Sequence, residues 1–339
     1  MSIESLGGAQ SRNSPETAPQ QCASAVLMIR PAAFDYNPET AATNRMQQPA
    51  PGSVAGPDAL PGQPQALSEF EQFTRALRSE GITVCVVDDT PAPPKPDAIF
   101  PNNWVSFHED GTVVLYPMQA ESRRRERRPQ IIDTVVERLG FRMSRVLDLT
   151  KNEAAGRFLE GTGSLVLDRC NRVAYACISP RTHPALVEEW ARELGYEAVL
   201  FEAFDRGGVP FYHTNVMMCI GARMAVLGTC AMSDDDRARV IERLEITGRD
   251  VIEIQYDEIE QFAGNMLELA SWDEALGDYR LLVMSEAARR SLRPEIYTRL
   301  SASTDYMLGV PVPTIERLGG GSVRCMLAEV FLPVKASST

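Results

Sequence analysis

The chain has 339 residues, 44% of them apolar, and a formal net charge of −12 at pH 7. The length is enough for one large domain or two ordinary ones, and the acidic balance disfavours a nucleic-acid binder, which needs a basic face. The seven cysteines form no CxxC pair, and none of the three histidines stands at metal-ligand spacing from a cysteine. This pattern favours reduced thiols in the cytoplasm and argues against a transition-metal site.

The first elements in chain order are a tail and a short strand. Residues 1–22 are rich in Ser, Pro, Gln and Ala, and we expect them to form a disordered tail. A buried strand is predicted over Ala25–Arg30, a helix over 67–78 and a second strand over 82–87. Between the first strand and the helix, residues 47–65 hold many Pro, Gly and Gln residues. They indicate a surface loop and a candidate lid.

A repeat runs through the rest of the chain. Five short apolar segments begin near residues 103, 163, 215, 265 and 325, at intervals of 50 to 60 residues. A second strand follows each of the first four, and amphipathic helices are then predicted over about 129–139, 184–194, 233–244 and 285–302. The fifth segment lacks a helix downstream, so the N-terminal strands and helix are expected to complete it and close a ring. The repeat predicts an α/β fold, a five-fold pseudosymmetric propeller of ββαβ units, with chance similarity among apolar segments as the alternative.

In such a ring, the starts of the five segments meet at one axial pocket, where chemistry-bearing residues are found. Cys325 follows the run Gly319-Gly320-Gly321, whose backbone a ligand can approach closely. A thiol there is placed as a nucleophile, although buried structural cysteines are common. His213 stands at the mouth of the third segment, where an imidazole can act as acid and base. A packed histidine bound to a backbone carbonyl is the alternative.

Further polar residues stand at the starts of the other segments. Glu160 begins Glu160-Gly161-Thr162-Gly163 and is expected to bind substrate N–H groups or orient His213, whereas a solvated turn glutamate is the alternative. The amides among the remaining candidates can both donate and accept hydrogen bonds, which suits a neutral planar group such as a urea, although asparagine is also common in turns. The expected substrate-binding residues are Asn102, Asn103, Thr162, Asn215, Asn265 and Arg206.

The stretches around these residues resemble the pentein, or guanidino-group-modifying, superfamily, and most resemble the bacterial citrulline-utilization hydrolases (citrulline ureidases). The resemblance covers about residues 24–334 and implies a single catalytic domain over 23–335, a five-bladed propeller and no cofactor. By resemblance, Cys325 is the nucleophile, His213 the acid/base and Glu160 the catalytic carboxylate. The matching stretches read MIRPAAFDYNPETAATNRMQ, DAIFPNNWVSFHEDGTVVLYPM, RRRERR, FLEGTGSLVLDR, YHTNVMM, GNMLEL and GGGSVRCMLAEVF.

Departures from the arginine deiminase pattern bear on the substrate. Where deiminases have carboxylates, this chain has Asn103, Gly163 and Asn215. A cationic guanidinium needs anionic partners, so the sequence favours citrulline, cleaved to ornithine, CO2 and NH3. A Cys325 thiolate supported by protonated His213 would attack the ureido carbon. The open alternatives are an arginine dihydrolase, deiminase or amidinotransferase and, from another class, a non-catalytic ribosome-binding propeller.

Three features carry less weight. The run 123–128, RRRERR, is expected to be a solvated or salt-bridged face. Arg206, in a loop before His213, is a weak candidate for the cation that holds an α-carboxylate, and cysteines 170, 177, 219 and 230 are expected in the core. The expected partner is a small amino-acid substrate, with no nucleic acid and no membrane. The sequence leaves open whether the protein is a homo-oligomer.

Overall fold

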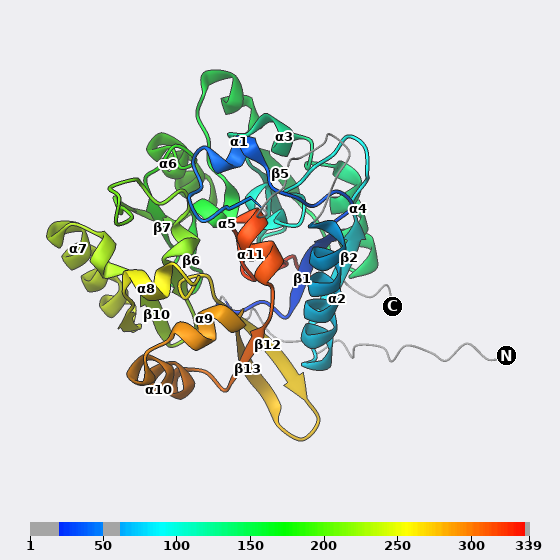
Figure 1. The fold of residues 1–339 in the computed structure, drawn as a ribbon. Coiled ribbons are helices and arrows are strands. Elements are labelled where there is room, and N and C mark those ends of the chain that lie inside the picture. Colours follow the sequence, from blue (N-terminus) through cyan, green and yellow to red (C-terminus); the bar gives the residue numbers. More distant parts are fainter. Residues whose placement is uncertain (1–19, 50–61, 336–339) are drawn as a thin grey trace.

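The computed structural model describes residues 20–49 and 62–335 (Figure 1). It is a mixed α/β fold in which the described strands form five sheets of three strands each. In sheet order, the strands are β3 (Val105–Phe107), β4 (Thr112–Leu115) and β5 (Arg145–Asp148); β6 (Val166–Asp168), β7 (Val173–Cys177) and β8 (Glu197–Phe201); β9 (Met218–Ile220), β10 (Met224–Leu227) and β11 (Asp250–Glu253); β12 (Leu267–Asp273), β13 (Gly277–Ser285) and β14 (Tyr306–Val310); and β15 (Ala328–Glu329), β1 (Ala25–Arg30) and β2 (Thr83–Asp88).

All five sheets share one topology. In each sheet, one outer strand runs antiparallel to the middle strand and the other runs parallel to it, as β3 and β5 do on either side of β4. The fifth sheet joins the two ends of the chain, because β15 pairs with β1 and β1 pairs with β2. The predicted repeat and its completion by the N-terminal strands are therefore confirmed at the level of the sheets. β1 is buried along most of its length, as expected for an apolar run covered on both faces.

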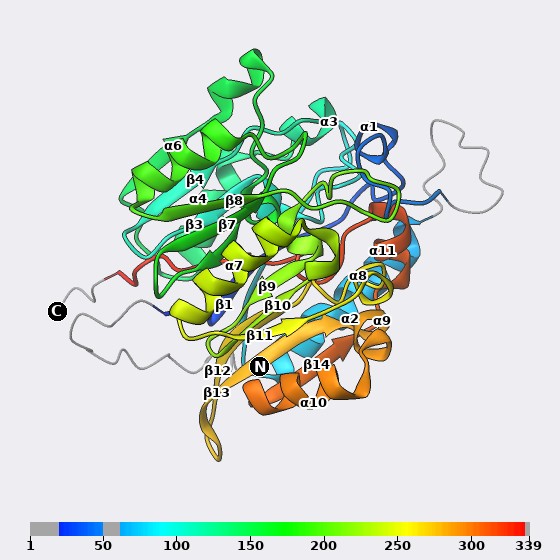
Figure 2. The same cartoon turned by 90° about the vertical axis from the view of Figure 1, so that its left-hand side faces the viewer.

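A helical connection links the middle strand of each sheet to its parallel neighbour, as a parallel pair requires. In Figure 1 these helices lie toward the outside of the molecule, and Figure 2 shows the same arrangement from the side. They are α2 (Gln63–Ser79), α4 (Pro129–Arg138), α6 (Pro184–Leu194), α7 (Asp234–Ile246), and the pair α9 (Glu286–Ser291) and α10 (Pro294–Ser303). The prediction of a single helix over 285–302 is wrong in one respect. This stretch forms two helices, because Pro294 cannot continue a helix that begins before it.

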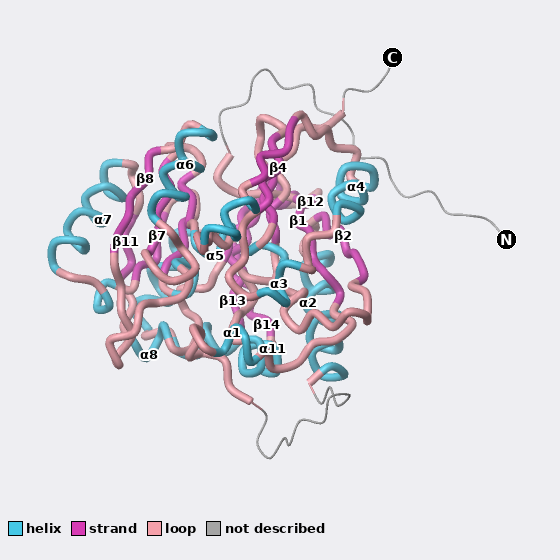
Figure 3. The backbone as a smooth tube through the Cα atoms, turned by 90° about the horizontal axis from the view of Figure 1, so that it is seen from above, coloured by secondary structure: helices cyan, strands magenta, loops and turns pink. Residues whose placement is uncertain are grey.

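Short helical turns stand before the first strands. Figure 3 shows α5 near the centre of the molecule, and α11 lies near the centre in the view of Figure 1. These short elements hold several of the residues singled out in the sequence. The short α-helices and 3-10 elements are α1 (Pro38–Ala41), α3 (Glu121–Arg124), α5 (Gly161–Ser164), α8 (Tyr256–Ile259), α11 (Pro313–Gly319), η1 (Pro101–Asn103), η2 (Thr150–Ala155), η3 (Thr214–Val216) and η4 (Thr229–Ala231).

Two predicted segments fall partly outside the described residues, namely most of the tail over 1–22 and residues 50–61 of the candidate lid. The described end of the tail segment belongs to the folded body. Gln21 is buried and donates hydrogen bonds to the carbonyls of Leu167 and Ile220, and Cys22 is buried as well. Within the described residues, no helix is both long and apolar enough to span a membrane.

Candidate active site

A small cavity brings together residues from distant parts of the chain. Three predicted site residues line it: Cys325, His213 and Asn103. The remaining lining comes from the loop at 319–321 and from Thr40, Asn44, Asp97, Phe100, Arg123, Arg181 and Tyr212. The lining therefore combines one thiol, one imidazole, two guanidinium groups and one carboxylate.

The glycine-rich loop that delivers Cys325 is packed tightly against its neighbours. Gly320 ends α11 with φ +61, a left-handed conformation that glycine adopts without strain. A Cβ at this position would lie 2.5 Å from Nδ2 of Asn44. The Gly320 carbonyl accepts hydrogen bonds from Asn44 and from the Tyr212 hydroxyl. The glycines thus serve close packing around the cavity, and Cys325 itself is buried.

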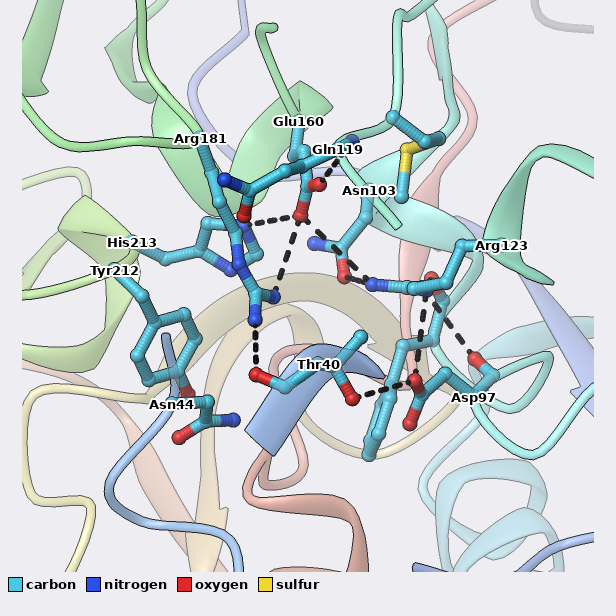
Figure 4. A network of polar contacts seen from close by, with 12 residues as sticks. Thr40, Asn44, Asp97, Asn103, Gln119, Arg123, Glu160, Arg181, Tyr212 and His213 are labelled. Carbon is cyan, nitrogen blue, oxygen red and sulfur yellow. Dashed lines mark hydrogen bonds and ion pairs between the residues drawn. The ribbon is translucent and has the colours of Figure 1, made fainter. Parts of the chain in front are cut away.

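His213 and Glu160 form a buried pair. His213 Nε2 lies 2.8 Å from Glu160 Oε2 (Figure 4). An ionised carboxylate only accepts hydrogen bonds, so Nε2 carries the proton and Nδ1 is the unprotonated nitrogen. Burial lowers the pKa of His213 to about 4, although the hydrogen bond and charge of Glu160 oppose this shift. Burial therefore favours the neutral form of His213 near pH 7, and the expected support of the Cys325 thiolate by protonated His213 stays a prediction.

Glu160 is the centre of a buried ionic network. Its carboxylate lies 3.5 Å from Nη1 of Arg181 and 4.0 Å from Nη1 of Arg123, and it accepts a hydrogen bond from the backbone N–H of Gln119 (Figure 4). Burial would raise the pKa of Glu160, but Arg181 and His213 outweigh burial and lower it to about 2. Glu160 is therefore ionised, and its hydrogen bond fixes the tautomer of the imidazole. Its expected role in orienting His213 for catalysis stays a prediction.

Arg123 corrects the interpretation of the RRRERR run. Its side chain is buried and lines the cavity, whereas Arg125 in the same run is exposed. It donates from Nε and Nη2 to both carboxylate oxygens of Glu126, over 2.9 and 3.0 Å, and from Nη1 to Oδ1 of Asn103 over 2.8 Å. The first residue of the run thus belongs to the candidate site and not to a solvated face.

Asn103 presents one defined end of its amide to the cavity. Because Arg123 can only donate, it fixes Oδ1 of Asn103 toward itself and turns Nδ2 away, toward His213 (Figure 4). Nδ2 is buried and has no hydrogen-bond partner among the described residues. A Cβ at Gly163 would lie 2.5 Å from this nitrogen and 2.7 Å from His213 Nδ1. Glycine at position 163 therefore leaves room beside both groups.

Other predicted residues lie around Cys325 or behind the cavity wall. Nδ2 of Asn265 and Nδ2 of Asn215 lie 3.4 Å and 3.6 Å from Cys325 Sγ, so both amides contact the thiol. Asn102 is buried, and its backbone carbonyl accepts a hydrogen bond from the Thr162 hydroxyl. Neither Asn102 nor Thr162 lines the cavity.

Arg206 lies elsewhere. It is exposed and pairs with Asp257 and Glu260 beside a larger groove. The buried cation that the sequence reading missed is Arg181, whose guanidinium lies over the Tyr212 ring, 5.1 Å from its centroid. Of the four cysteines expected in the core, Cys177 and Cys219 are buried, Cys230 is partly buried and Cys170 is exposed.

The segment from Asn37 to Gln47 covers the cavity and was also missed as part of the site. Asn37 Nδ2 and Thr40 Oγ1 donate to Oδ2 of Asp97, and Arg181 donates to the Thr40 carbonyl. Among the described residues, this segment lies over the cavity. It precedes most of the candidate lid predicted at 47–65. Its stretch MIRPAAFDYNPETAATNRMQ carries the family resemblance, which was the available signal.

Comparison with known proteins places the chain in a family. Residues 30–332 match the family model for N,N dimethylarginine dimethylhydrolase, eukaryotic, whereas no curated protein matches the chain. The structure is similar to the N-terminal domain of ArgZ, an arginine dihydrolase from cyanobacteria, with a TM-score of 0.68 and 17% identity over 92% of this chain and 99% of that domain. The chain spans 41% of full-length ArgZ.

Two further solved structures are similar. AgrE bound to L-arginine has a TM-score of 0.68 and 19% identity, over 92% of this chain and 41% of that one. A dimethylarginine dimethylaminohydrolase in adduct with S-methyl-L-thiocitrulline has a TM-score of 0.59 and 16% identity, over 90% of this chain and 98% of that one. At these identities the structures support the fold alone, and the family model supplies the assignment. The chain belongs to the N,N-dimethylarginine dimethylhydrolase family, within the pentein superfamily of guanidino-group-modifying hydrolases.

Proposed function

We propose that the protein hydrolyses the terminal ureido group of citrulline, or of a close analogue, to give ornithine, CO2 and NH3. His213 Nδ1 accepts the Cys325 proton, and the thiolate attacks the ureido carbon. The proton then passes to the departing δ-nitrogen as the C–N bond breaks. A water that loses its proton to His213 hydrolyses the S-carbamoyl cysteine, which restores the thiol and releases carbamate. No step needs a cofactor.

The orientation of the Asn103 amide is the main support for a substrate that has a ureido group. Arg123 occupies Oδ1 of Asn103, which leaves Nδ2 as a buried donor beside His213 with no partner among the described residues. The group that fills this place must accept a hydrogen bond. A ureido carbonyl can accept one, whereas a guanidinium carries only donors. An unpaired buried donor is unfavourable, so this amide favours citrulline over arginine.

The charges around the cavity support the same choice. Among the described residues, Arg123, Arg181 and Asp97 are the charged groups that line it. A guanidinium substrate would meet two cations and one carboxylate there. We propose that Arg181 binds the substrate α-carboxylate in place of Arg206, because it is buried and lines the cavity.

Arginine dihydrolysis is the second candidate. Oδ1 of Asp97 is buried without a hydrogen-bond partner among the described residues, so it is available to a guanidinium. The arginine dihydrolase activity of ArgZ points the same way. Against this, burial raises the pKa of Asp97, while Arg123 opposes that shift. Burial thus weakens this carboxyl group as an anionic partner for a guanidinium.

Incubation of the purified protein with citrulline and, separately, with arginine tests the proposal, with ornithine, citrulline and ammonia followed in each reaction. We expect ornithine from citrulline and none after Cys325→Ser. Asn103→Asp offers an acceptor in place of the amide donor, so kcat/KM for citrulline relative to arginine should fall at least about tenfold. Faster ornithine release from arginine than from citrulline would establish the dihydrolase, and citrulline release from arginine would indicate a deiminase.

We also propose that the five sheets close into the five-fold propeller expected from the repeat. The shared strand order supports this arrangement, and Phe107 bridges to Val330, which brings the fifth sheet beside the first. A ring closed in this way would place all five segment starts around the cavity.

A further inference from the structure

The sulfur of Cys325 is contacted by two amide groups whose role differs from the substrate binding expected of them. Asn265 Nδ2 lies 3.4 Å from Sγ and Asn215 Nδ2 lies 3.6 Å from it. Their carbonyl oxygens are slightly farther from Sγ, at 3.7 Å for Asn265 and 4.0 Å for Asn215. Both asparagines are buried, so water does not compete with these contacts.

The backbone fixes the orientation of the Asn265 amide. Its Oδ1 accepts a hydrogen bond from the backbone N–H of Arg324 over 3.1 Å, and its Nδ2 donates one to the backbone carbonyl of Asn215 over 2.8 Å. Exchange of the two amide ends would set a donor against a donor and an acceptor against an acceptor. Asn265 therefore presents an N–H, and not a lone pair, as its nearest group to Cys325.

A source of support for the thiolate is needed within the protein. Burial lowers the pKa of His213 to about 4, so this imidazole is mostly neutral before it accepts the Cys325 proton and is a weak source of positive charge for the sulfur. The ureido substrate proposed above is neutral as well. Among the described residues, the hydrogen-bond partners of Sγ are these two amides. Amide donors that point at an anion stabilise it strongly in a buried site.

We propose that Asn215 and Asn265 stabilise the thiolate that Cys325 forms when its proton passes to His213 Nδ1, already before substrate binds, so that the nucleophile does not depend on a positive charge of the substrate. The inference rests on the proposed function in that Cys325 is taken as its nucleophile. It also explains why an amide suits position 215, since a carboxylate there would repel a thiolate at the same distance.

Asn215 is the cleaner probe, because the hydrogen bonds of its side-chain amide within the described residues are those to Cys325. Asn215→Ala removes the donor, and Asn215→Asp replaces it with a negative charge. The measurement is the rate of iodoacetamide alkylation of Cys325 without substrate, as a function of pH, with the modified peptide quantified by mass spectrometry. Gln130→Glu, on the exposed face of α4, is the matched control because it changes the net charge by the same amount.

The expected order of the alkylation rates is the order that a charge effect on Cys325 would produce. At pH 7, alkylation should slow about tenfold in Asn215→Ala and further in Asn215→Asp, and the pH profile should move upward in that order. Gln130→Glu should match the wild type. Equal alkylation profiles in wild type and both folded Asn215 variants would overturn the proposal. These rates are measured without substrate, so a failure of citrulline turnover contradicts the proposed function and leaves this inference intact.

Discussion

Oε2 of Glu160 lies 2.8 Å from Nε2 of His213, and this contact decides which imidazole nitrogen faces the cavity. The pair is fully buried, and Arg181 holds the carboxylate from the other side. A neutral histidine in a fixed tautomer is suited to accept a proton from the thiol and later from water. We therefore propose that Glu160 orients His213 during the reaction, as its hydrogen bond to Nε2 suggests.

Glu160→Gln is expected to lower kcat by about 10²- to 10⁴-fold, because an amide can hold either tautomer and removes the charge that stabilises protonated His213. Steady-state kinetics with citrulline would measure the change, with circular dichroism as the check on folding. A kcat within threefold of the wild type, in a folded variant, would contradict the role assigned to Glu160.

Arg181→Met and Arg206→Met form a matched pair that tests the carboxylate anchor. We expect KM for citrulline to rise at least about tenfold in Arg181→Met, because a buried guanidinium binds a carboxylate through charge-assisted hydrogen bonds. KM should stay within twofold in Arg206→Met, since Arg206 is exposed and pairs on the surface.

N-carbamoylputrescine, which lacks the α-carboxylate, separates anchoring from a structural effect of Arg181. The Arg181→Met penalty on KM should largely disappear with this compound. A penalty of equal size for both compounds would show that Arg181 acts through the packing of Glu160 and not through the carboxylate.

Gly163→Ala is expected to lower kcat at least about tenfold with little effect on the unfolding temperature. The new Cβ would lie 2.5 Å from Asn103 Nδ2 and 2.8 Å from Cε1 of His213, closer than packed atoms approach. One or both side chains must then leave their positions in the cavity. The measurement is kcat for citrulline alongside thermal unfolding, and an unchanged kcat would show that position 163 does not border the reacting groups.

Buried histidines should make stability depend on pH. Burial lowers the pKa of His213 to about 4 and that of His108 to about 3, from an ordinary value of 6.5. Below pH 6.5 the unfolded chain therefore takes up protons that the folded chain refuses. Each histidine then lowers the free energy of unfolding by up to about 1.4 kcal/mol per pH unit between pH 6.5 and its folded pKa.

Glu126 acts in the opposite direction, because burial raises its pKa to about 7 in spite of Arg123. The histidine effect is therefore measured as a difference between proteins. Urea unfolding of wild type and His213→Asn at pH 7, 6 and 5 should show a shallower loss of stability toward low pH in the variant. Parallel profiles for the two proteins would contradict a buried, neutral His213.

The sequence by itself determined the local elements and the repeat. The apolar run Ala25–Arg30, the helix over 184–194 and the first strands after Asn103 and Asn215 appear where their patterns predicted them. These elements follow from periodicity and from turn residues, which act over a few positions along the chain. The nucleophile and acid/base candidates were also found in this way, because each stands at the start of a repeated segment.

Only the tertiary structure decided which charged groups surround them. RRRERR begins with the last two residues of α3 and continues into a turn and a loop, so no periodicity distinguishes the buried Arg123 from the exposed Arg125. Arg181 reaches Thr40 across 141 positions, a contact without any local signal. A charged side chain is buried only where partners from other segments compensate its desolvation, and the three-dimensional fold alone brings those partners together.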